Sequence, residues 1–149
     1  MSAARHFLDT NIFVYTFDRH SQGKAKRAEN LVAEALATGL GMISYQVAQE
    51  FVAVARKPFL TPMSFEQIER YWHTTLQPLL SVHSSPGLFI RALDLARRDQ
   101  LSWYDSLIVA AAIQGGCEIL YSEDLQHGRR FGDLIIQNPF LLASSGSNL

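Results

Sequence analysis

The sequence predicts an α/β domain, a three-layer α/β/α sandwich around a central, mostly parallel sheet of four to five strands. Short apolar runs that fit buried strands alternate along the chain with longer segments of helical periodicity. The 149 residues, 48% of them hydrophobic, are enough for one substantial core. No repeat or linker divides the chain, so we expect a single domain over residues 1–142 and a disordered polar tail over residues 143–149.

The N-terminal part contains the first two predicted strands and the first two predicted helices. Residues 6–9 fit a short buried strand, and residues 11–17 fit a helix. Residues 21–38 carry apolar side chains at helical spacing, and Gly39 ends that helix. Residues 42–44 then fit a second short strand.

The middle of the chain predicts two more helices and a strand. An apolar pattern over residues 45–57 indicates a helix that stops at Pro58, because proline cannot continue a helix. Ser64 opens the next helix, in which apolar residues recur on one face. Residues 79–83 are the third candidate strand.

The C-terminal part predicts two helices, one of them central, and two strands. Residues 86–100 fit a helix with a proline near its start. Residues 103–114 are apolar almost all round, which predicts a central, buried helix, and a Gly-Gly pair ends it. Residues 118–122 fit a fourth strand and residues 134–137, more weakly, a fifth.

Composition excludes several classes of protein. A net charge of −1 gives no global indication of nucleic-acid binding, although basic residues cluster locally. Cys117 is the only cysteine, so no intrachain disulfide is possible, and we expect a buried thiol in a cytoplasmic protein. The N-terminus lacks a signal-peptide pattern and no apolar stretch reaches membrane-spanning length, so no membrane partner is expected.

Four carboxylates occupy positions where charge is unusual. Asp9 and Asp124 follow apolar strands, Asp105 opens the central helix, and Glu50 interrupts an apolar helix. Ligands of parallel sheets bind beyond the carboxyl ends of the strands, where the strand order reverses. All four acids can face that edge, and such a set would suit a divalent cation.

Each acid also has a simpler interpretation. Asp9 can cap the following helix, Asp124 can belong to a turn, and Asp105 fits a capping-box variant that begins at Ser102. For Glu50 the simpler interpretation is a surface ion pair, but no basic residue lies three or four positions away. Glu50 is therefore the acid that is hardest to explain structurally.

The neighbours of Asp124 and the histidines carry weaker signals. Glu123 could be the functional acid in place of Asp124, but it is expected to be solvated, because side chains after a strand alternate in direction. His127 is a candidate for substrate contact, although a satisfied loop histidine is the favoured interpretation. The five histidines form no pair at metal-binding spacing, which excludes a zinc site with Cys and His ligands.

Four segments of the chain surround the candidate acids: Phe7-Leu-Asp-Thr-Asn-Ile-Phe-Val-Tyr15, Gln49-Glu50-Phe51, Trp103-Tyr-Asp-Ser-Leu-Ile-Val-Ala-Ala111 and Leu120-Tyr-Ser-Glu-Asp-Leu-Gln-His-Gly128. They resemble the motifs of PIN-domain proteins, most closely the VapC-type toxins of type II toxin–antitoxin modules. Each motif alone is weak, but four in this order are fairly specific, and together they span nearly the whole chain.

The resemblance implies an endoribonuclease that depends on Mg²⁺, with Mn²⁺ as a substitute. Carried over by position, the catalytic acids are Asp9, Glu50, Asp105 and Asp124. Asp9, Asp105 and Asp124 would bind the metal, with Asn11 and Ser122 in supporting positions. The resemblance also implies an antitoxin that covers the active site, and a toxin homodimer.

An RNA substrate would need charged and stacking side chains. The candidates for phosphate contact are Lys24, Lys26, Arg27, Arg129 and Arg130, and those for stacking are Tyr15, Phe17 and Trp103. The simpler interpretation is a solvated helix face for the basic residues and a core position for Trp103.

Two other functions remain open at this stage. One is an inactive PIN-like domain that serves as a binding scaffold. The other is a phospho-accepting signalling domain, which would use a lysine near the end of the last strand. This alternative ranks low, because the three lysines, Lys24, Lys26 and Lys57, all lie early in the chain.

Overall fold

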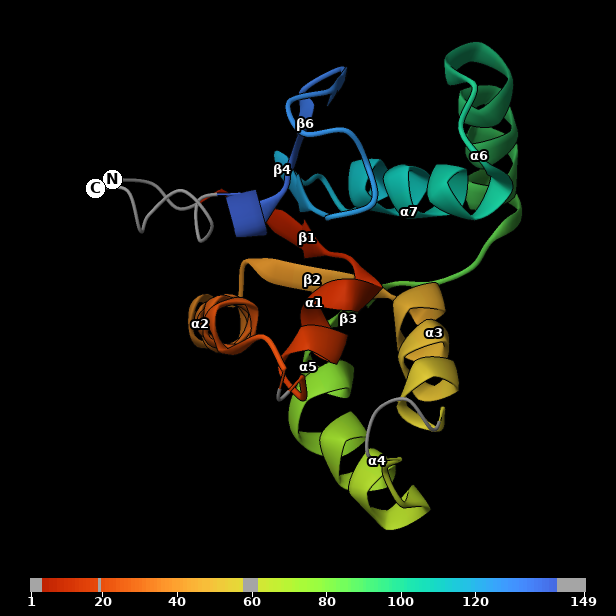
Figure 1. The fold of residues 1–149 in the computed structure, drawn as a ribbon. Helices are drawn as coiled ribbons and strands as arrows, with labels where there is room; N and C mark the ends of the chain where they lie inside the picture. The colour runs from red at the N-terminus through yellow and green to blue at the C-terminus, as the bar shows by residue number, and fades with distance from the viewer. Residues whose placement is uncertain (1–3, 19, 58–61, 142–149) are drawn as a thin grey trace.

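The protein contains one six-stranded sheet with the strand order β3-β2-β1-β4-β6-β5. The computed structural model (Figure 1) describes residues 4–18, 20–57 and 62–141. The strands are β1 (His6–Leu8), β2 (Gly41–Ser44), β3 (Leu80–Val82), β4 (Ile119–Tyr121), β5 (Arg130–Phe131) and β6 (Leu134–Gln137). All neighbouring strands run parallel except β5 and β6, which are antiparallel.

The helices confirm the predicted α/β class. They are α1 (Thr10–Tyr15), α2 (Gln22–Thr38), α3 (Tyr45–Ala55), α4 (Phe65–Tyr71), α5 (Gln77–Leu79), α6 (Pro86–Asp99) and α7 (Trp103–Gln114), with a π-helical turn, η1 (Trp72–Leu76), between α4 and α5. None of the helices in the described ranges is long and apolar enough to cross a membrane.

Two details of the prediction were wrong. The sheet has six strands rather than four to five. The prediction missed β5, because this strand is only two residues long and has no periodic signal. The helix expected after Ser64 is divided into α4, η1 and α5, whereas Ser64 itself forms the capping box with Gln67 that opens it. The tail predicted to be disordered lies outside the described residues.

Strand β2 shows how the sheet is covered on both faces. A Cβ atom on Gly41 would lie 2.2 Å from the Cβ of Ala35, so glycine lets helix α2 approach this face closely. On the opposite face the sulfur of Met42 lies so near Gly115, at the end of α7, that a Cβ there would be 2.4 Å away. Because neighbouring residues of a strand point to opposite faces, α2 and α7 form the outer layers of a sandwich.

Helix α7 is the central helix that its composition predicts. Its residues Ile108 to Ala112 are all buried, together with Phe7 and Leu120 of the sheet. Since α7 leads into the parallel strand β4, its first turn lies at the carboxyl edge of the sheet.

The topology creates a switch point between β1 and β4. From β1 the chain continues to β2 and β3 on one side, and the later strands β4, β6 and β5 lie on the other. Leu8 pairs with Tyr121, so the residues that follow these two strands leave the sheet side by side. Asp9 and Ser122 are those residues, at the place where open α/β sheets bind ligands.

Candidate active site

Asp9 is the most buried of the four candidate acids, with 7% of its surface exposed. One carboxylate oxygen accepts the backbone N–H of Thr10 at 2.7 Å, which makes Asp9 the N-cap of α1. The other oxygen accepts the hydroxyl of Ser122 at 2.8 Å. The capping interpretation is therefore correct, but it accounts for only one of the two oxygens.

Ser122 connects Asp9 to the loop after β4. Its side chain is fully buried, and its oxygen accepts the backbone N–H groups of Asp124 at 3.2 Å and Leu125 at 3.3 Å. The hydroxyl that donates to Asp9 thus also orders the loop that carries Asp124. This contact holds two segments together at the switch point.

Glu50 lies on the second turn of α3 and contacts Thr10, the residue after Asp9. Its carboxylate accepts the hydroxyl of Thr10 at 2.6 Å and the side-chain amide of Gln46 at 3.2 Å. Within the described part of the chain Glu50 forms no ion pair. These neutral donors fix the side chain and leave its charge uncompensated.

Asp124 and Asp105 complete the group. The side-chain amide of Asn11 donates to Asp124 at 3.0 Å, so the first residues of α1 contact both Asp124 and Glu50. The backbone N–H of Asp105 donates to the hydroxyl of Ser102 at 3.3 Å. The reciprocal bond of a full capping box is not formed in the described structure, so capping does not occupy the Asp105 carboxylate.

The pKa shifts of Asp9 and Asp124 indicate that Glu50 acts electrostatically on both acids and that Asp105 acts on Asp124. Burial raises the pKa of Asp9 to about 6, and the charges of Asp124 and Glu50 contribute, although hydrogen bonds oppose the shift. Burial also raises the pKa of Asp124, and the neighbouring carboxylates contribute further, with Asp105 the largest and Glu50 among them. Asp105 is thus connected to the cluster through Asp124.

The donor set is chemically suited to a hard divalent cation. Carboxylates, hydroxyls and an amide oxygen are the ligands that Mg²⁺ prefers, and a bound cation would relieve the repulsion at Asp9. In the conformation seen, no three or more His, Cys, Asp or Glu side chains of the described residues are arranged to hold an ion. Mg²⁺ is usually held by only one or two carboxylates and keeps several waters, so the residues fit such a site.

The prediction that Glu123 is solvated was wrong, because its side chain is 24% exposed and paired with Lys24. Its two carboxylate oxygens accept bonds from Lys24 Nζ, at 2.7 Å, and from the hydroxyl of Tyr15. Burial opposes ionisation, but these donors hold the pKa of Glu123 below its ordinary value. Alternation of side chains predicts that Glu123 points away from Asp124, but it does not reveal the partners on α1 and α2.

The other candidate side chains have mixed outcomes. His127 is the satisfied loop histidine that was favoured, since its Nδ1 accepts the backbone N–H of Asn138 at 3.0 Å. Cys117 is buried, as predicted, and burial raises its pKa to about 12. Arg129 donates to the carbonyl of Asp99 at 2.8 Å, so not all of its guanidinium N–H groups are available to a substrate.

Solved structures with the same fold come from toxin–antitoxin systems. A toxin–antitoxin complex from Klebsiella pneumoniae has a TM-score of 0.64 and 19% identity, over 90% of this chain and 97% of that one. VapBC2 of Rickettsia felis, bound to a promoter DNA fragment, has a TM-score of 0.58 and 21% identity, over 89% and 96%. VapC20 of Mycobacterium tuberculosis, a toxin that cleaves the sarcin–ricin loop, has a TM-score of 0.58 and 18% identity, over 80% of this chain and 89% of that one.

Sequence comparison identifies the family independently of the fold. Comparison with curated protein sequences gives no significant match. The family model of the PIN domain, however, matches residues 6–131, a range that includes all four candidate acids. The chain, with its mostly parallel sheet and its acids at the switch point, therefore belongs to the PIN domain family.

Proposed function

We propose that this protein is a divalent-metal-dependent endoribonuclease and the toxin of a toxin–antitoxin pair. The observation that carries the proposal is the acidic cluster, in which buried Asp9 has a raised pKa beside Asp124 and Glu50. PIN domain membership and the toxin structures with the same fold support it. Mg²⁺ is the proposed ion, with Mn²⁺ as a substitute.

Asp9, Asp105 and Asp124 are the proposed metal-binding residues. A bound cation would polarise the scissile phosphate and lower the pKa of an attacking water. Ser122 and Asn11 hold Asp9 and Asp124 in place through the bonds described above. The buried setting of Asp9 excludes water from one side of the site.

Glu50 is proposed to orient the attacking water and accept its proton. Its carboxylate is held by Thr10 and Gln46, and both donors are neutral, so it remains an acceptor. In-line attack by water, with the P–O bond to the 3′-oxygen broken and that oxygen protonated as it leaves, would produce a 5′-phosphate and a 3′-hydroxyl. These ends would distinguish the reaction from metal-independent cleavage by the ribose 2′-hydroxyl.

The direct test is cleavage of mixed RNA oligonucleotides while Mn²⁺ or Mg²⁺ is titrated into metal-free protein. We expect cleavage that requires the cation, is lost in Asp124→Asn, and is retained in Glu69→Gln, a control acid exposed on α4. Metal-independent cleavage, or equal activity in Asp124→Asn, would exclude the proposed site. Metal binding without turnover of any RNA would favour the inactive scaffold.

An antitoxin is the proposed protein partner. Two of the similar structures are described as a toxin–antitoxin complex and as VapBC2, and both cover nearly the whole of this chain. Co-expression with the product of a short adjacent reading frame should yield a complex with suppressed cleavage. Full cleavage in the presence of a bound partner would exclude the inhibitory role.

A homodimer through α6 is the proposed assembly of the toxin. Figure 1 shows α6 projecting from the body of the molecule, where it packs mainly on α7. It exposes three large apolar side chains, Phe89, Ile90 and Leu93, and the Phe89 ring also packs edge-on against Trp103 of α7. A second copy related by a two-fold axis could bring Ile90 against Leu93 and cover these side chains.

The dimer is tested by light scattering on two glutamate variants. Ile90 is 64% exposed, so Ile90→Glu should leave the fold intact but shift the mass toward a monomer. Leu36→Glu is the control, because Leu36 is 38% exposed on α2, away from α6. An unchanged dimer in Ile90→Glu would exclude this face, and a wild-type monomer would exclude the assembly.

A further inference from the structure

Glu123 joins three elements beside the acidic cluster without belonging to the proposed metal ligands. Lys24 of α2 donates to one carboxylate oxygen at 2.7 Å, and the Tyr15 hydroxyl of α1 donates to the other. Both oxygens therefore have partners, and neither partner is a proposed metal-binding residue. We call these three residues, Lys24, Tyr15 and Glu123, the bracket.

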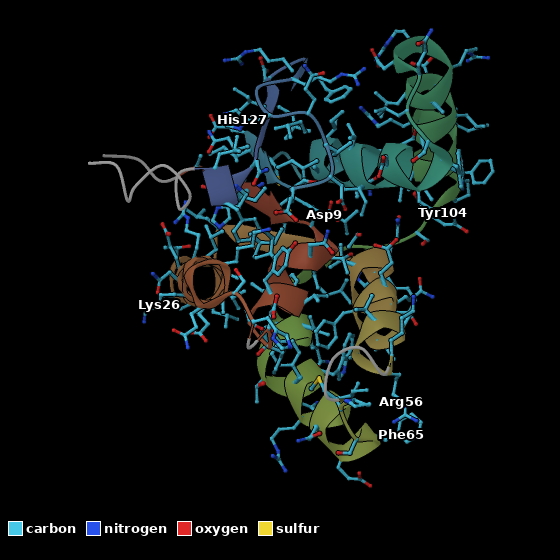
Figure 2. All side chains as sticks on the ribbon, viewed as in Figure 1. Asp9, Lys26, Arg56, Phe65, Tyr104 and His127 are labelled. Carbon is cyan, nitrogen blue, oxygen red and sulfur yellow. The ribbon has the colours of Figure 1, made fainter. Side chains whose placement is uncertain are left out.

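The surroundings of Lys24 strengthen the bracket. Its ammonium lies 4.8 Å from the centre of the Tyr15 ring and 5.6 Å from that of Phe140, and these two rings pack edge to face at 4.9 Å. The Lys24 and Glu123 side chains are 35% and 24% exposed, so solvent screens this ion pair less than a surface pair. By contrast, Figure 2 shows Lys26 pointing away from the molecule on the same helix.

The bracket holds the same loop that Ser122 holds from inside. Ser122 is buried and bonded to Asp9, the next residue is Glu123, and the next is Asp124, which the Asn11 amide contacts. The loop is therefore fixed by two neighbouring side chains: Ser122 bonds to Asp9, and Glu123 bonds to Lys24 and Tyr15. Without the bracket, the hydrogen bonds of Asp124 within the described residues would be those to Asn11 and to Ser122.

We infer that Glu123 is a positioning residue, held by Lys24 and Tyr15, which fixes the loop that presents Asp124 to the metal. The inference rests on the proposed metal site, but the loop can be measured without it. It also assigns Lys24 a structural partner, in place of the RNA contact for which its charge made it a candidate. Neighbours of metal ligands affect metal affinity because they fix the orientation of the ligands.

The test compares Lys24→Met with the matched control Lys26→Met. Both changes remove one positive charge from α2, but of these two lysines Lys24 is the one that contacts Glu123. Hydrogen exchange at the backbone N–H groups of Asp124 and Leu125 reports on the loop, and Mn²⁺ titration by calorimetry reports on the site. We expect faster exchange and roughly tenfold weaker Mn²⁺ binding in Lys24→Met only. Lys24→Arg keeps the positive charge, so it should retain most of the wild-type exchange protection and Mn²⁺ affinity.

The outcomes separate failure of the bracket from failure of the proposed function. Unchanged exchange in Lys24→Met, or a Mn²⁺ affinity equal to that of Lys26→Met, would overturn the positioning role. Equal loss of Mn²⁺ affinity in both variants would also overturn it, because a general charge effect would then suffice. If the wild type binds Mn²⁺, responds as expected to these changes and cleaves no RNA, the bracket stands and the nuclease proposal fails.

Discussion

Replacement of Asp9 by Asn should stabilise the metal-free protein at neutral pH, although the same change should abolish cleavage. Burial raises the pKa of Asp9 from 3.8 to about 6, so the ionised form is disfavoured in the folded state. A shift of this size corresponds to ~3 kcal/mol of lost stability when Asp9 is charged. The stability is fully present below the unfolded pKa of 3.8 and is lost as the pH rises through the folded pKa of about 6.

The Asn side chain keeps one contact and disturbs another. Its oxygen can still accept the Thr10 N–H, but its amide then faces the Ser122 hydroxyl, which costs ~1 kcal/mol. The net gain is therefore ~2 kcal/mol, or a Tm higher by roughly 4–8 °C at pH 7.5 in a chelator. The gain should vanish near pH 4, where Asp9 of the wild type is largely protonated.

Thermal melts of both proteins from pH 4 to 8, with and without Mn²⁺, provide the measurement. Added Mn²⁺ should raise the Tm of the wild type more than that of Asp9→Asn, because a ligand stabilises the state that binds it. A lower Tm of the variant at pH 7.5 without metal would refute the electrostatic reasoning. Asp9 would then serve mainly as the N-cap of α1.

Three further predictions follow from the site and its supporting contacts. Asp105→Asn should abolish RNA cleavage and melt no lower than the wild type without metal, since its carboxylate caps no helix and its charge repels Asp124. Ser122→Ala should lower the free energy of unfolding by ~2 kcal/mol in urea titration, because its partners lose a buried bond. Gly41→Ala should destabilise by ~1–3 kcal/mol through its clash with Ala35, whereas Gly23→Ala, in open space on α2, should stabilise by ~0.5–1 kcal/mol.

Local sequence is enough to predict the edge at which the acids lie. Asp9 and Asp124 come just after strands, and parallel strands end at one edge whatever the loops do. Glu50 is recognisable because a charge in an apolar helix without a local partner needs a reason. The catalytic and metal-binding roles of these residues stay predictions.

The bracket and the sixth strand could not be predicted in the same way. Glu123 and Lys24 are 99 residues apart, and no periodic pattern connects residues on different elements. Strand β5 pairs with β6 in an antiparallel hairpin, and its two residues are too few to carry a periodic signal of their own. The π-helical turn η1 changes the helical phase after Tyr71, which a regular spacing does not anticipate.

The hydrogen bond between Asp9 and Ser122 connects residues 113 positions apart in the chain. A ribosome therefore makes Asp9 well before Ser122. Until Asp105 is made, the nascent polypeptide lacks at least half of the four acids, and any product that terminates before Ser122 can never assemble the cluster. Synthesis past Asp124 is thus a built-in condition for the chemistry of this edge.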